Sequence, residues 1–183
     1  MNIMDSVKVY DKTFVPFIKY EVLMKDVDAV AERLNADYAG GGDIPIILCV
    51  LNGAMMFTAE LMKRLTFDCE LMSIKIKSYS GDHSTGEVKQ TLGLTSDITG
   101  RRIIIVEDIV DTGFSMMYLT EYLKQKGAKD TKICTMLFKP DTYDKPLKID
   151  YIARNIPSKF ILGFGLDYDE LGRQYKDIYV LED

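Results

Sequence analysis

Apolar and polar residues form blocks along the chain that predict strands and helices in turn. Residues 44–51 and 103–106 are apolar runs without alternation, as in strands buried on both faces. Residues 53–65 and 115–127 place apolar side chains at three- and four-residue steps, which indicates amphipathic helices. Strands alternating with helices predict right-handed crossovers and a parallel sheet flanked by helices, so the expected fold class is α/β.

Shorter patterns supply the remaining predicted elements. Residues 18–34 combine a short strand-like piece with a helix, and glycines at 40–42 end that segment. Residues 78–87 are polar and contain two glycines, which predicts an exposed loop or hairpin arm before a return strand at 88–94. We predict further strands at residues 70–76, 132–138, 151–153, 160–164 and 178–181. The chain has no internal repeat or linker, so residues 1–183 form one predicted domain.

Carboxylates follow the buried strand at 103–106 without interruption. Glu107 and Asp108 come directly after it, and Asp111 comes just before a Thr-Gly pair. Open α/β sheets bind ligands at the carboxyl ends of their strands, which is where these acids are expected. Glu107 and Asp108 would repel a bare polyphosphate, so they are better suited to hydroxyl groups, a metal ion or a developing positive charge.

The next residues favour an anion. Thr112 and Ser115 supply hydroxyls, and Gly113 lets the backbone approach a ligand closely. The N–H groups at the start of the following helix attract a phosphate. A ligand with a phosphate at one end and a polyol beside it satisfies both halves of the segment, and that describes a sugar phosphate.

Composition narrows the function classes. The chain has 183 residues, 47% hydrophobic, with a net charge of −5, which argues against nucleic-acid binding as the main role. Cys49, Cys69 and Cys134 give an odd count without a zinc pattern, and the single histidine, His83, excludes a multi-histidine metal site. Residues 1–10 have no signal-peptide core, so a cytoplasmic protein is expected.

Four segments, in order, resemble the motifs of type I phosphoribosyltransferases, and most closely those of hypoxanthine-guanine phosphoribosyltransferases. Residues 106–113 resemble the signature that binds 5-phosphoribosyl-1-pyrophosphate, and residues 51–57 resemble the pyrophosphate loop. Residues 77–89 resemble the mobile catalytic loop, and residues 159–168 with Arg173 resemble the purine-binding end. The resemblance runs from about Ile44 to the C-terminus. One departure is Asn52, where the family often has lysine.

This resemblance implies a fold and a reaction. The fold is a central parallel sheet flanked by helices, with a small hood formed from the N-terminal residues and roughly residues 140–183. The reaction is purine salvage, in which hypoxanthine or guanine and 5-phosphoribosyl-1-pyrophosphate give IMP or GMP and pyrophosphate. The implied cofactor is Mg²⁺, the partners are these small molecules rather than nucleic acid or membrane, and the implied assembly is a homodimer or homotetramer.

The site residues take roles accordingly. Asp111 is the expected general base, and the phosphoribosyl group is expected on Glu107, Asp108, Thr112, Gly113 and Ser115. The resemblance implies pyrophosphate contacts from Asn52, Gly53, Ser78, Tyr79 and Arg173. It implies purine contacts from Lys139, Phe160, Ile161 and Asp167, and metal contacts from Glu107, Asp108 and Asp167.

Other interpretations stay open at this point. The chain is alternatively a sister transferase for another base, or a non-catalytic RNA-binding regulator of the same fold. Asp111-Thr112-Gly113 also occurs in aspartic proteases, but those enzymes need two such loops in a mostly β chain. Taken alone, Asp111 or Thr112 is a helix cap, Lys139 a surface lysine and Phe160 a core residue.

Overall fold

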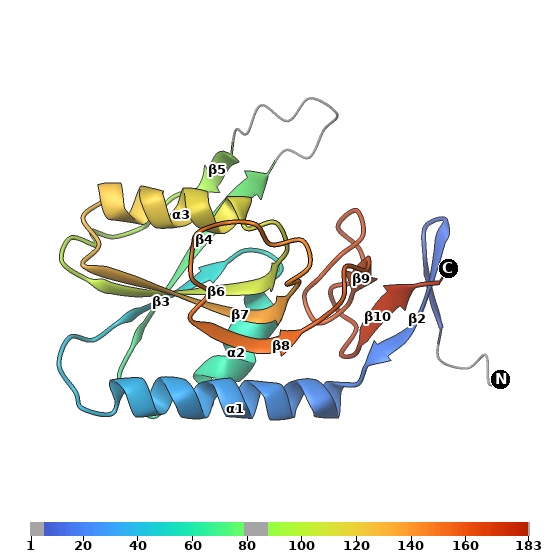
Figure 1. Cartoon of the computed structure of the whole chain (residues 1–183), viewed down its shortest axis with the longest axis horizontal. Helices are drawn as coiled ribbons and strands as arrows, with labels where there is room; N and C mark the ends of the chain where they lie inside the picture. Colours follow the sequence, from blue (N-terminus) through green and yellow to red (C-terminus); the bar gives the residue numbers. More distant parts are fainter. Residues whose placement is uncertain (1–5, 79–87, 183) are drawn as a thin grey trace.

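The computed structural model describes residues 6–78 and 88–182, and its centre is a six-stranded sheet (Figure 1). The strand order is β5-β4-β3-β6-β7-β8, and every neighbouring pair is parallel except β4 with β5. This confirms the α/β class and the return strand. The strands are β3 (Ile46–Val50), β4 (Glu70–Ser78), β5 (Val88–Leu92), β6 (Arg102–Val110), β7 (Asp130–Phe138) and β8 (Tyr151–Asn155). Residues 79–87 of the loop predicted at 78–87, Tyr79 among them, lie outside the described residues.

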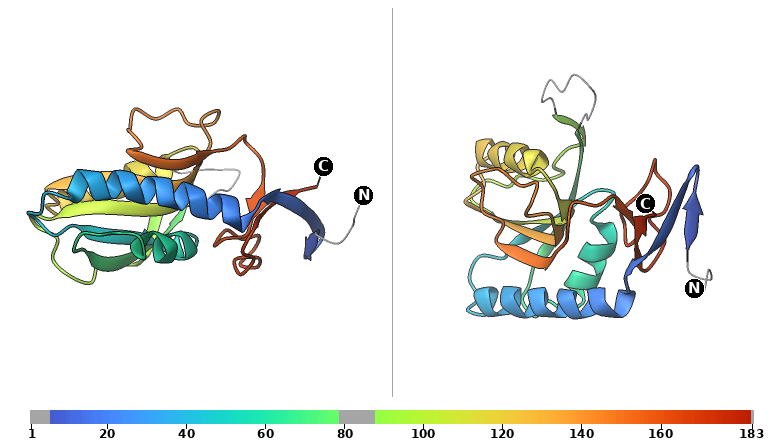
Figure 2. Two further views of the ribbon diagram at one scale, coloured as in Figure 1. Left: turned by 90° about the horizontal axis from the view of Figure 1, so that it is seen from below. Right: turned by 45° about the vertical axis from the view of Figure 1, so that its right-hand side comes forward.

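Helices cover both faces of this sheet. Helices α1 (Tyr20–Tyr38) and α2 (Met55–Met62) pack on one face, and α3 (Phe114–Gln125) packs on the other (Figures 1 and 2). Ile104 and Val106 of β6 lie in the core shared with α1 and α2, whereas Ile103 and Ile105 lie in the core shared with α3. The run at 103–106 therefore shows no alternation because both of its faces are buried. None of the described helices has the length and apolarity needed to cross a bilayer.

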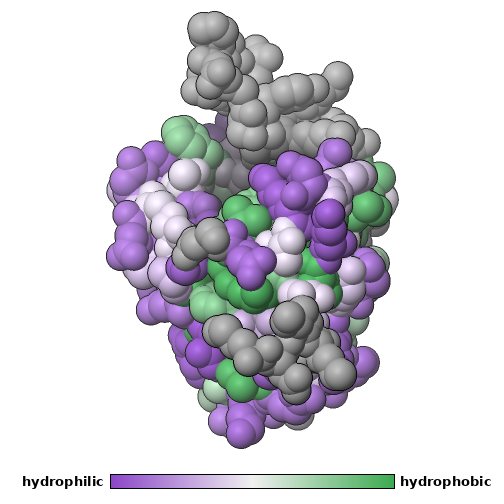
Figure 3. Space-filling view, turned by 90° about the vertical axis from the view of Figure 1, so that its right-hand side faces the viewer, coloured by the Kyte–Doolittle hydropathy of each residue, from purple (hydrophilic) through white to green (hydrophobic). Residues whose placement is uncertain are grey.

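A second, antiparallel sheet joins the two ends of the chain. Its order is β1-β2-β10-β9, with β1 (Val7–Val9), β2 (Lys12–Ile18), β9 (Ile161–Leu162) and β10 (Ile178–Leu181). In Figure 1 it lies on the side toward which the arrow of β8 points. Phe14 and Leu162 are fully buried in a small core of its own. Apolar surface shows among charged residues at this end of the molecule (Figure 3).

Most predicted boundaries shift by a few residues, and two larger differences stand out. The helix predicted at 53–65 begins only at Met55, because residues 51–54 form a turn that contains a cis peptide bond between Leu51 and Asn52. The hairpin of β1 and β2 was not predicted beyond a strand-like piece near Ile18. Pro16 argues against an interior strand, and the sheet accommodates it where the register of β10 shifts between Ile178 and Tyr179.

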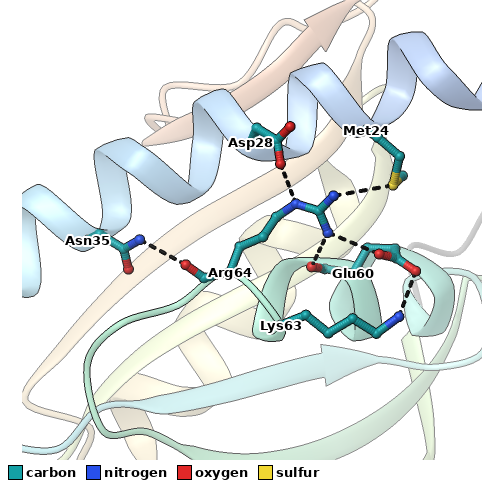
Figure 4. Close-up of polar contacts among 6 residues, drawn as sticks. All are labelled: Met24, Asp28, Asn35, Glu60, Lys63 and Arg64. Carbon is teal, nitrogen blue, oxygen red and sulfur yellow. Dashed lines mark hydrogen bonds and ion pairs between the residues drawn. The ribbon is translucent and has the colours of Figure 1, made fainter.

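Arg64 connects α1 to the end of α2 (Figure 4). Its guanidinium donates to the Asp28 carboxylate, to the Glu60 backbone oxygen at 2.8 Å and to Glu60 Oε2 at 2.9 Å. Asn35 of α1 donates to the Arg64 backbone oxygen at 2.9 Å. These contacts fix the relative position of the two helices under the sheet.

Asp177 ties the second sheet to the start of α1. Its side chain is buried, and it accepts hydrogen bonds from the Tyr20 N–H at 2.8 Å and from Lys19 Nζ at 3.1 Å. Tyr20 is the first residue of α1, so the carboxylate satisfies a helix N–H group that has no intrahelical acceptor. Burial alone would raise the pKa of Asp177, but these hydrogen bonds outweigh it and lower that pKa.

We expect Asp177→Ala to lower the free energy of unfolding at pH 7 by roughly 1–3 kcal/mol, because it leaves a helix N–H group without its charged acceptor. A lowered folded-state pKa stabilises the protein above the unfolded-state pKa, and this contribution is lost as pH falls through the folded-state pKa. The difference between wild type and variant should therefore shrink on acidification. Urea unfolding across pH measures it, with the exposed Asp68→Ala as control, and a difference that stays constant with pH would contradict the account.

Candidate active site

Predicted site residues from distant parts of the chain meet at one edge of the main sheet. Asn52 follows β3, Asp111 follows β6 and Lys139 follows β7, and these three strands are parallel neighbours. The Lys139 N–H donates to the Val110 oxygen at 3.0 Å, which extends the ladder between β6 and β7 by one bond. The carboxyl ends of parallel strands lie at the same edge, so the topology itself assembles this group.

The turn at 111–115 bounds a pocket of about 120 Å³ whose other lining residues are Glu107, Ile109, Val110 and Met116. Gly113 caps α3 with φ of 81°, in the left-handed region that favours glycine, and no side chain makes a capping hydrogen bond there. The simple capping interpretation of Asp111 or Thr112 is therefore wrong. The amino end of α3 faces this turn with its helix dipole, which suits an anion.

Glu107, which lines this pocket, and its neighbour Asp108 are adjacent carboxyls near the end of β6. Glu107 is only 9% exposed, and burial, together with the charge of Asp108, raises its pKa well above its usual value. Burial also raises the pKa of Asp108, although the Ile109 N–H, 2.8 Å from Oδ1, and the charge of Arg173 act in the opposite direction. This pair resists full ionisation in the free protein, so a cationic group or hydroxyl donors on a ligand would stabilise its ionised form.

Two glycines allow the segments around Asp108 to approach. A side chain at Gly53 would collide with the Asp108 carboxylate, and a side chain at Gly165 would collide with the Gly53 backbone oxygen. The turn after β3 is thus enclosed between the end of β6 and the C-terminal segment. This is the physical reason for glycine at both positions.

Arg173 organises the C-terminal side of the site. Its guanidinium donates to the Gly165 oxygen at 2.9 Å and lies 2.8 Å from Asp167 Oδ1. Asp167 also accepts from the Glu170 N–H at 2.8 Å. Asp167 and Arg173 are not ordinary surface residues, because their side chains are only 28% and 21% exposed and are paired with each other.

Asp111 has a partner on each carboxylate oxygen. Lys139 Nζ lies 2.7 Å from Oδ2, and the Thr142 hydroxyl donates to Oδ1 at 2.5 Å. Burial alone would raise the pKa of Asp111, but these two hydrogen bonds outweigh it and hold that pKa below its usual value. The Lys139 side chain is 11% exposed, so it is not a surface lysine, and it neutralises a carboxylate at the mouth of the pocket.

Phe160 lies in an aromatic cluster rather than in the core. Its ring is 5.9 Å from the ring of Phe14 and 5.7 Å from that of Tyr168, between centroids, yet the residue is 43% exposed. The interpretation as a core residue is therefore wrong. The next residue, Ile161, is buried in β9. An exposed aromatic ring held by other rings is suited to stacking on a flat ligand.

The carboxylates do not form a preassembled metal cage. Among residues 6–78 and 88–182 no three His, Cys, Asp or Glu side chains gather closely enough to hold an ion. Glu107, Asp108 and Asp167 are thus not one three-ligand group. Oxygen donors that supply only part of a coordination shell fit Mg²⁺, which usually keeps water and substrate phosphate oxygens among its ligands.

Three further contacts were not predicted from the sequence. They are the Thr142 hydroxyl on Asp111, the packing of the Tyr143 ring against Gly113, and the approach of Gly165 to Gly53. A signal for the first exists, because Lys139-Pro140-Asp141-Thr142 has proline in the second position of a β-turn. The other two depend on tertiary packing and leave no local pattern.

The similarity of this sequence to known proteins agrees with this geometry. The family model for the phosphoribosyl transferase domain matches residues 19–169. A hypoxanthine-guanine phosphoribosyltransferase of Streptococcus thermophilus is 37% identical over 164 residues, which cover 89% of this chain and 90% of that protein. One of Lactococcus lactis is 38% identical over 166 residues, covering 90% of this chain and 89% of that protein.

Solved structures are similar over the same length. A hypoxanthine phosphoribosyl transferase of Trypanosoma cruzi superposes with a TM-score of 0.86 at 31% identity, covering 96% of this chain and 95% of that chain. A hypoxanthine phosphoribosyltransferase from Staphylococcus aureus superposes with a TM-score of 0.85 at 30% identity, covering 91% of this chain and 90% of that one.

The buried carboxyl pair predicts a pH-dependent gain in stability for Glu107→Gln without ligands. A carboxyl whose folded-state pKa is raised loses stability as pH rises from the unfolded-state pKa through the folded-state pKa, whereas glutamine does not titrate. The melting temperature of the variant should therefore exceed that of wild type by an amount that grows as pH rises above about 4, the unfolded-state pKa of a glutamate. Scanning calorimetry measures this against the exposed Glu121→Gln, and a difference independent of pH would show that Glu107 is ionised throughout.

Proposed function

This chain belongs to the phosphoribosyltransferase family. We therefore propose that it transfers the phosphoribosyl group of 5-phosphoribosyl-1-pyrophosphate to hypoxanthine or guanine. It is a purine salvage transferase. Relatives named hypoxanthine-guanine phosphoribosyltransferase, which align with about nine-tenths of the chain, support this. The observation that carries the proposal is the buried Lys139, which pairs with Asp111 in the turn 111–115 that bounds the pocket. It places a donor for a base carbonyl beside a site for a sugar phosphate.

The phosphoribosyl group occupies the pocket at the end of β6. The 5′-phosphate binds the turn formed by Thr112, Gly113 and Ser115, where the start of α3 favours an anion. The ribose hydroxyls bind Glu107 and Asp108, directly or through a metal ion. This arrangement relieves the repulsion within the buried pair, because the ligand supplies hydrogen-bond donors or positive charge.

The pyrophosphate lies on the C-terminal side of this pocket. Arg173 is the cation there, close enough to Asp108 to lower its pKa. The turn at Asn52 and Gly53 offers backbone N–H groups, and Ser78 and Tyr79 belong to the same proposed subsite. Glu107, Asp108 and Asp167 are oxygen donors of the kind that Mg²⁺ prefers, and bound Mg²⁺ would neutralise charge on the leaving pyrophosphate.

The base lies between Lys139 and the aromatic cluster. Lys139 donates to the carbonyl oxygen at C6, Phe160 stacks on the ring, and Ile161 and Asp167 contact its far edge. In the reaction N9 forms a bond to C1′ as the bond from C1′ to the pyrophosphate oxygen breaks. The charge that develops on the ribose is positive, and the carboxylates of Glu107 and Asp108 stabilise it.

Asp111 accepts the proton that the base loses. Its lowered pKa keeps it ionised at neutral pH, so it is ready to receive a proton from N7 or N9 as the new bond forms. A carboxylate with a lowered pKa is a weak base in the free enzyme. The base strengthens it, because Lys139 then shares its positive charge with the C6 oxygen.

A homodimer or homotetramer in the cytoplasm completes the proposal. Phe114 and Met117 of α3 are 58% and 39% exposed, and this apolar surface suits burial against a second copy.

Nucleotide formation from a panel of free bases tests this function. Product with hypoxanthine or guanine supports it, product only with another base indicates a sister transferase, and no product with any base refutes catalysis. RNA filter binding across salt concentrations distinguishes the regulator, whose affinity should fall steeply with salt.

We expect Asp111→Asn to lower kcat by roughly 10²- to 10⁴-fold while the fold is retained, because asparagine cannot take up the proton. Steady-state kinetics at saturating substrates measure the loss. Asp141→Asn, an exposed aspartate two residues after Lys139, is the matched control. Turnover like that of wild type would remove Asp111 from the mechanism.

Lys139 predicts the choice of base. Its ammonium has only donors, so it pairs with the C6 oxygen of hypoxanthine but faces the amino group of adenine, and a site of this kind can reject the wrong analogue by roughly 10⁴-fold. Lys139→Ala should lower kcat/KM with hypoxanthine and shrink its advantage over adenine. Lys148→Ala removes an 81% exposed lysine of the same segment and should change neither value. Equal use of adenine and hypoxanthine by wild type would refute this role.

A further inference from the structure

A tight turn presents two donors to one carboxylate. The turn runs from Lys139 to Thr142, with Pro140 second, and the Thr142 N–H approaches the Lys139 oxygen at 3.4 Å. The first and last residues of a β-turn lie close together, so their side chains can converge on the same group. Here that group is Asp111, which follows the neighbouring strand β6.

The Thr142 hydroxyl can donate one hydrogen bond, and Asp111 accepts it. Its oxygen is 2.5 Å from Asp111 Oδ1 but 3.3 Å from the Lys139 backbone oxygen. The shorter contact is to a charged acceptor, and hydrogen bonds to charged groups are both shorter and stronger. Thr142 is half-buried in the turn, so its backbone holds the hydroxyl in this position.

We propose that Thr142 is a positioning residue for Asp111, holding the carboxylate in the orientation in which it accepts a proton from the purine. This inference rests on the proposed function. A carboxylate bonded at one oxygen still rotates about its Cβ–Cγ bond, whereas one bonded at both oxygens is fixed in its plane. Each oxygen keeps a further lone pair for the base.

Thr142 matters most when the base is bound. Lys139 must then donate to the C6 oxygen, so its hold on Asp111 Oδ2 competes with the substrate. The hydroxyl of Thr142 has no such second task. It keeps Asp111 in place through the reaction, while Lys139 selects the base.

The charged groups around Asp111 come from two elements. Lys139 faces it from the loop after β7, and the Glu107 carboxyl of β6 lines the same pocket. Thr142 adds a donor without adding charge, so its removal changes the acidity and orientation of Asp111 while the net charge of the site stays the same.

Thr142→Val, Thr142→Ala and Thr142→Ser test the proposal in the full-length enzyme. We expect Val and Ala to lower kcat about tenfold with the KM for the ribose donor changed less than about twofold, because orientation rather than donor binding is lost. Ser keeps the hydroxyl and should restore most of kcat. Thr120→Val, whose hydroxyl bonds the Met116 backbone oxygen within α3 at 2.8 Å, is the control and should resemble wild type.

The pH profile separates positioning from simple destabilisation. Loss of the Thr142 donor raises the pKa of Asp111, so the acidic limb of kcat/KM should move to higher pH in the Val and Ala variants. A structural role alone would lower the melting temperature and leave the limb in place. An unmoved limb, or a Ser variant as impaired as Val, overturns the proposal.

A double-mutant cycle with Asp111→Ala gives a second criterion. Thr142→Val should have no further effect once the carboxylate is gone, because its hydroxyl acts through Asp111. An effect that persists in the Asp111→Ala background would mean that Thr142 acts on the substrate directly. Failure of the proposed function is a separate outcome, since wild type itself would then form no nucleotide from hypoxanthine or guanine.

Discussion

Burial of β6 on both faces is the constraint on which the rest of the structure depends. Its side chains alternate between the core beneath α1 and α2 and the core beneath α3, so the strand cannot shift without exposing one of them. The end of β6 is therefore fixed relative to β3 and β7. Asn52, Asp111 and Lys139 follow those three strand ends, and a rigid sheet sets their spacing to within the tolerance that catalysis demands.

The same burial makes ionisation of the carboxyls at the end of β6 unfavourable in the absence of a ligand. Near the end of β6, Glu107 is buried and Asp108 beside it is partly buried, and at Asp108 the Ile109 N–H and the charge of Arg173 offset this burial in part. Asp111, three residues on, is balanced within the protein by Lys139 and Thr142. The carboxyls of Glu107 and Asp108 thus lack full compensation within the protein, which favours a ribose donor rich in hydroxyls and accompanied by a cation. The carboxylate of Asp111 is compensated, and this part of the pocket receives the base.

The sequence pattern predicted those parts of the site whose residues act together and are also close in sequence. The unalternating run at 103–106 and the following turn contain strand, anion site and helix in one segment, and the structure places them together. The hairpin of β1 and β2 was not predicted because Pro16 contradicts a strand locally and is tolerated only through pairing with β10. Thr142 was not predicted either, because its role depends on a strand about thirty residues away.

Lys139 links the compensated carboxylate of Asp111 to the choice of substrate. In the free protein the Lys139 ammonium is paired with Asp111. A purine with an oxygen at C6 must share this ammonium with Asp111, whereas a purine with an amino group at C6 can only displace it. Displacement would leave Asp111 with one of its two donors, and it would leave the Lys139 ammonium, which is largely removed from water, without its carboxylate partner. Discrimination therefore does not require a close steric fit around C6. It follows from an ion pair within the enzyme, which makes the wrong base break a contact that the right base can keep.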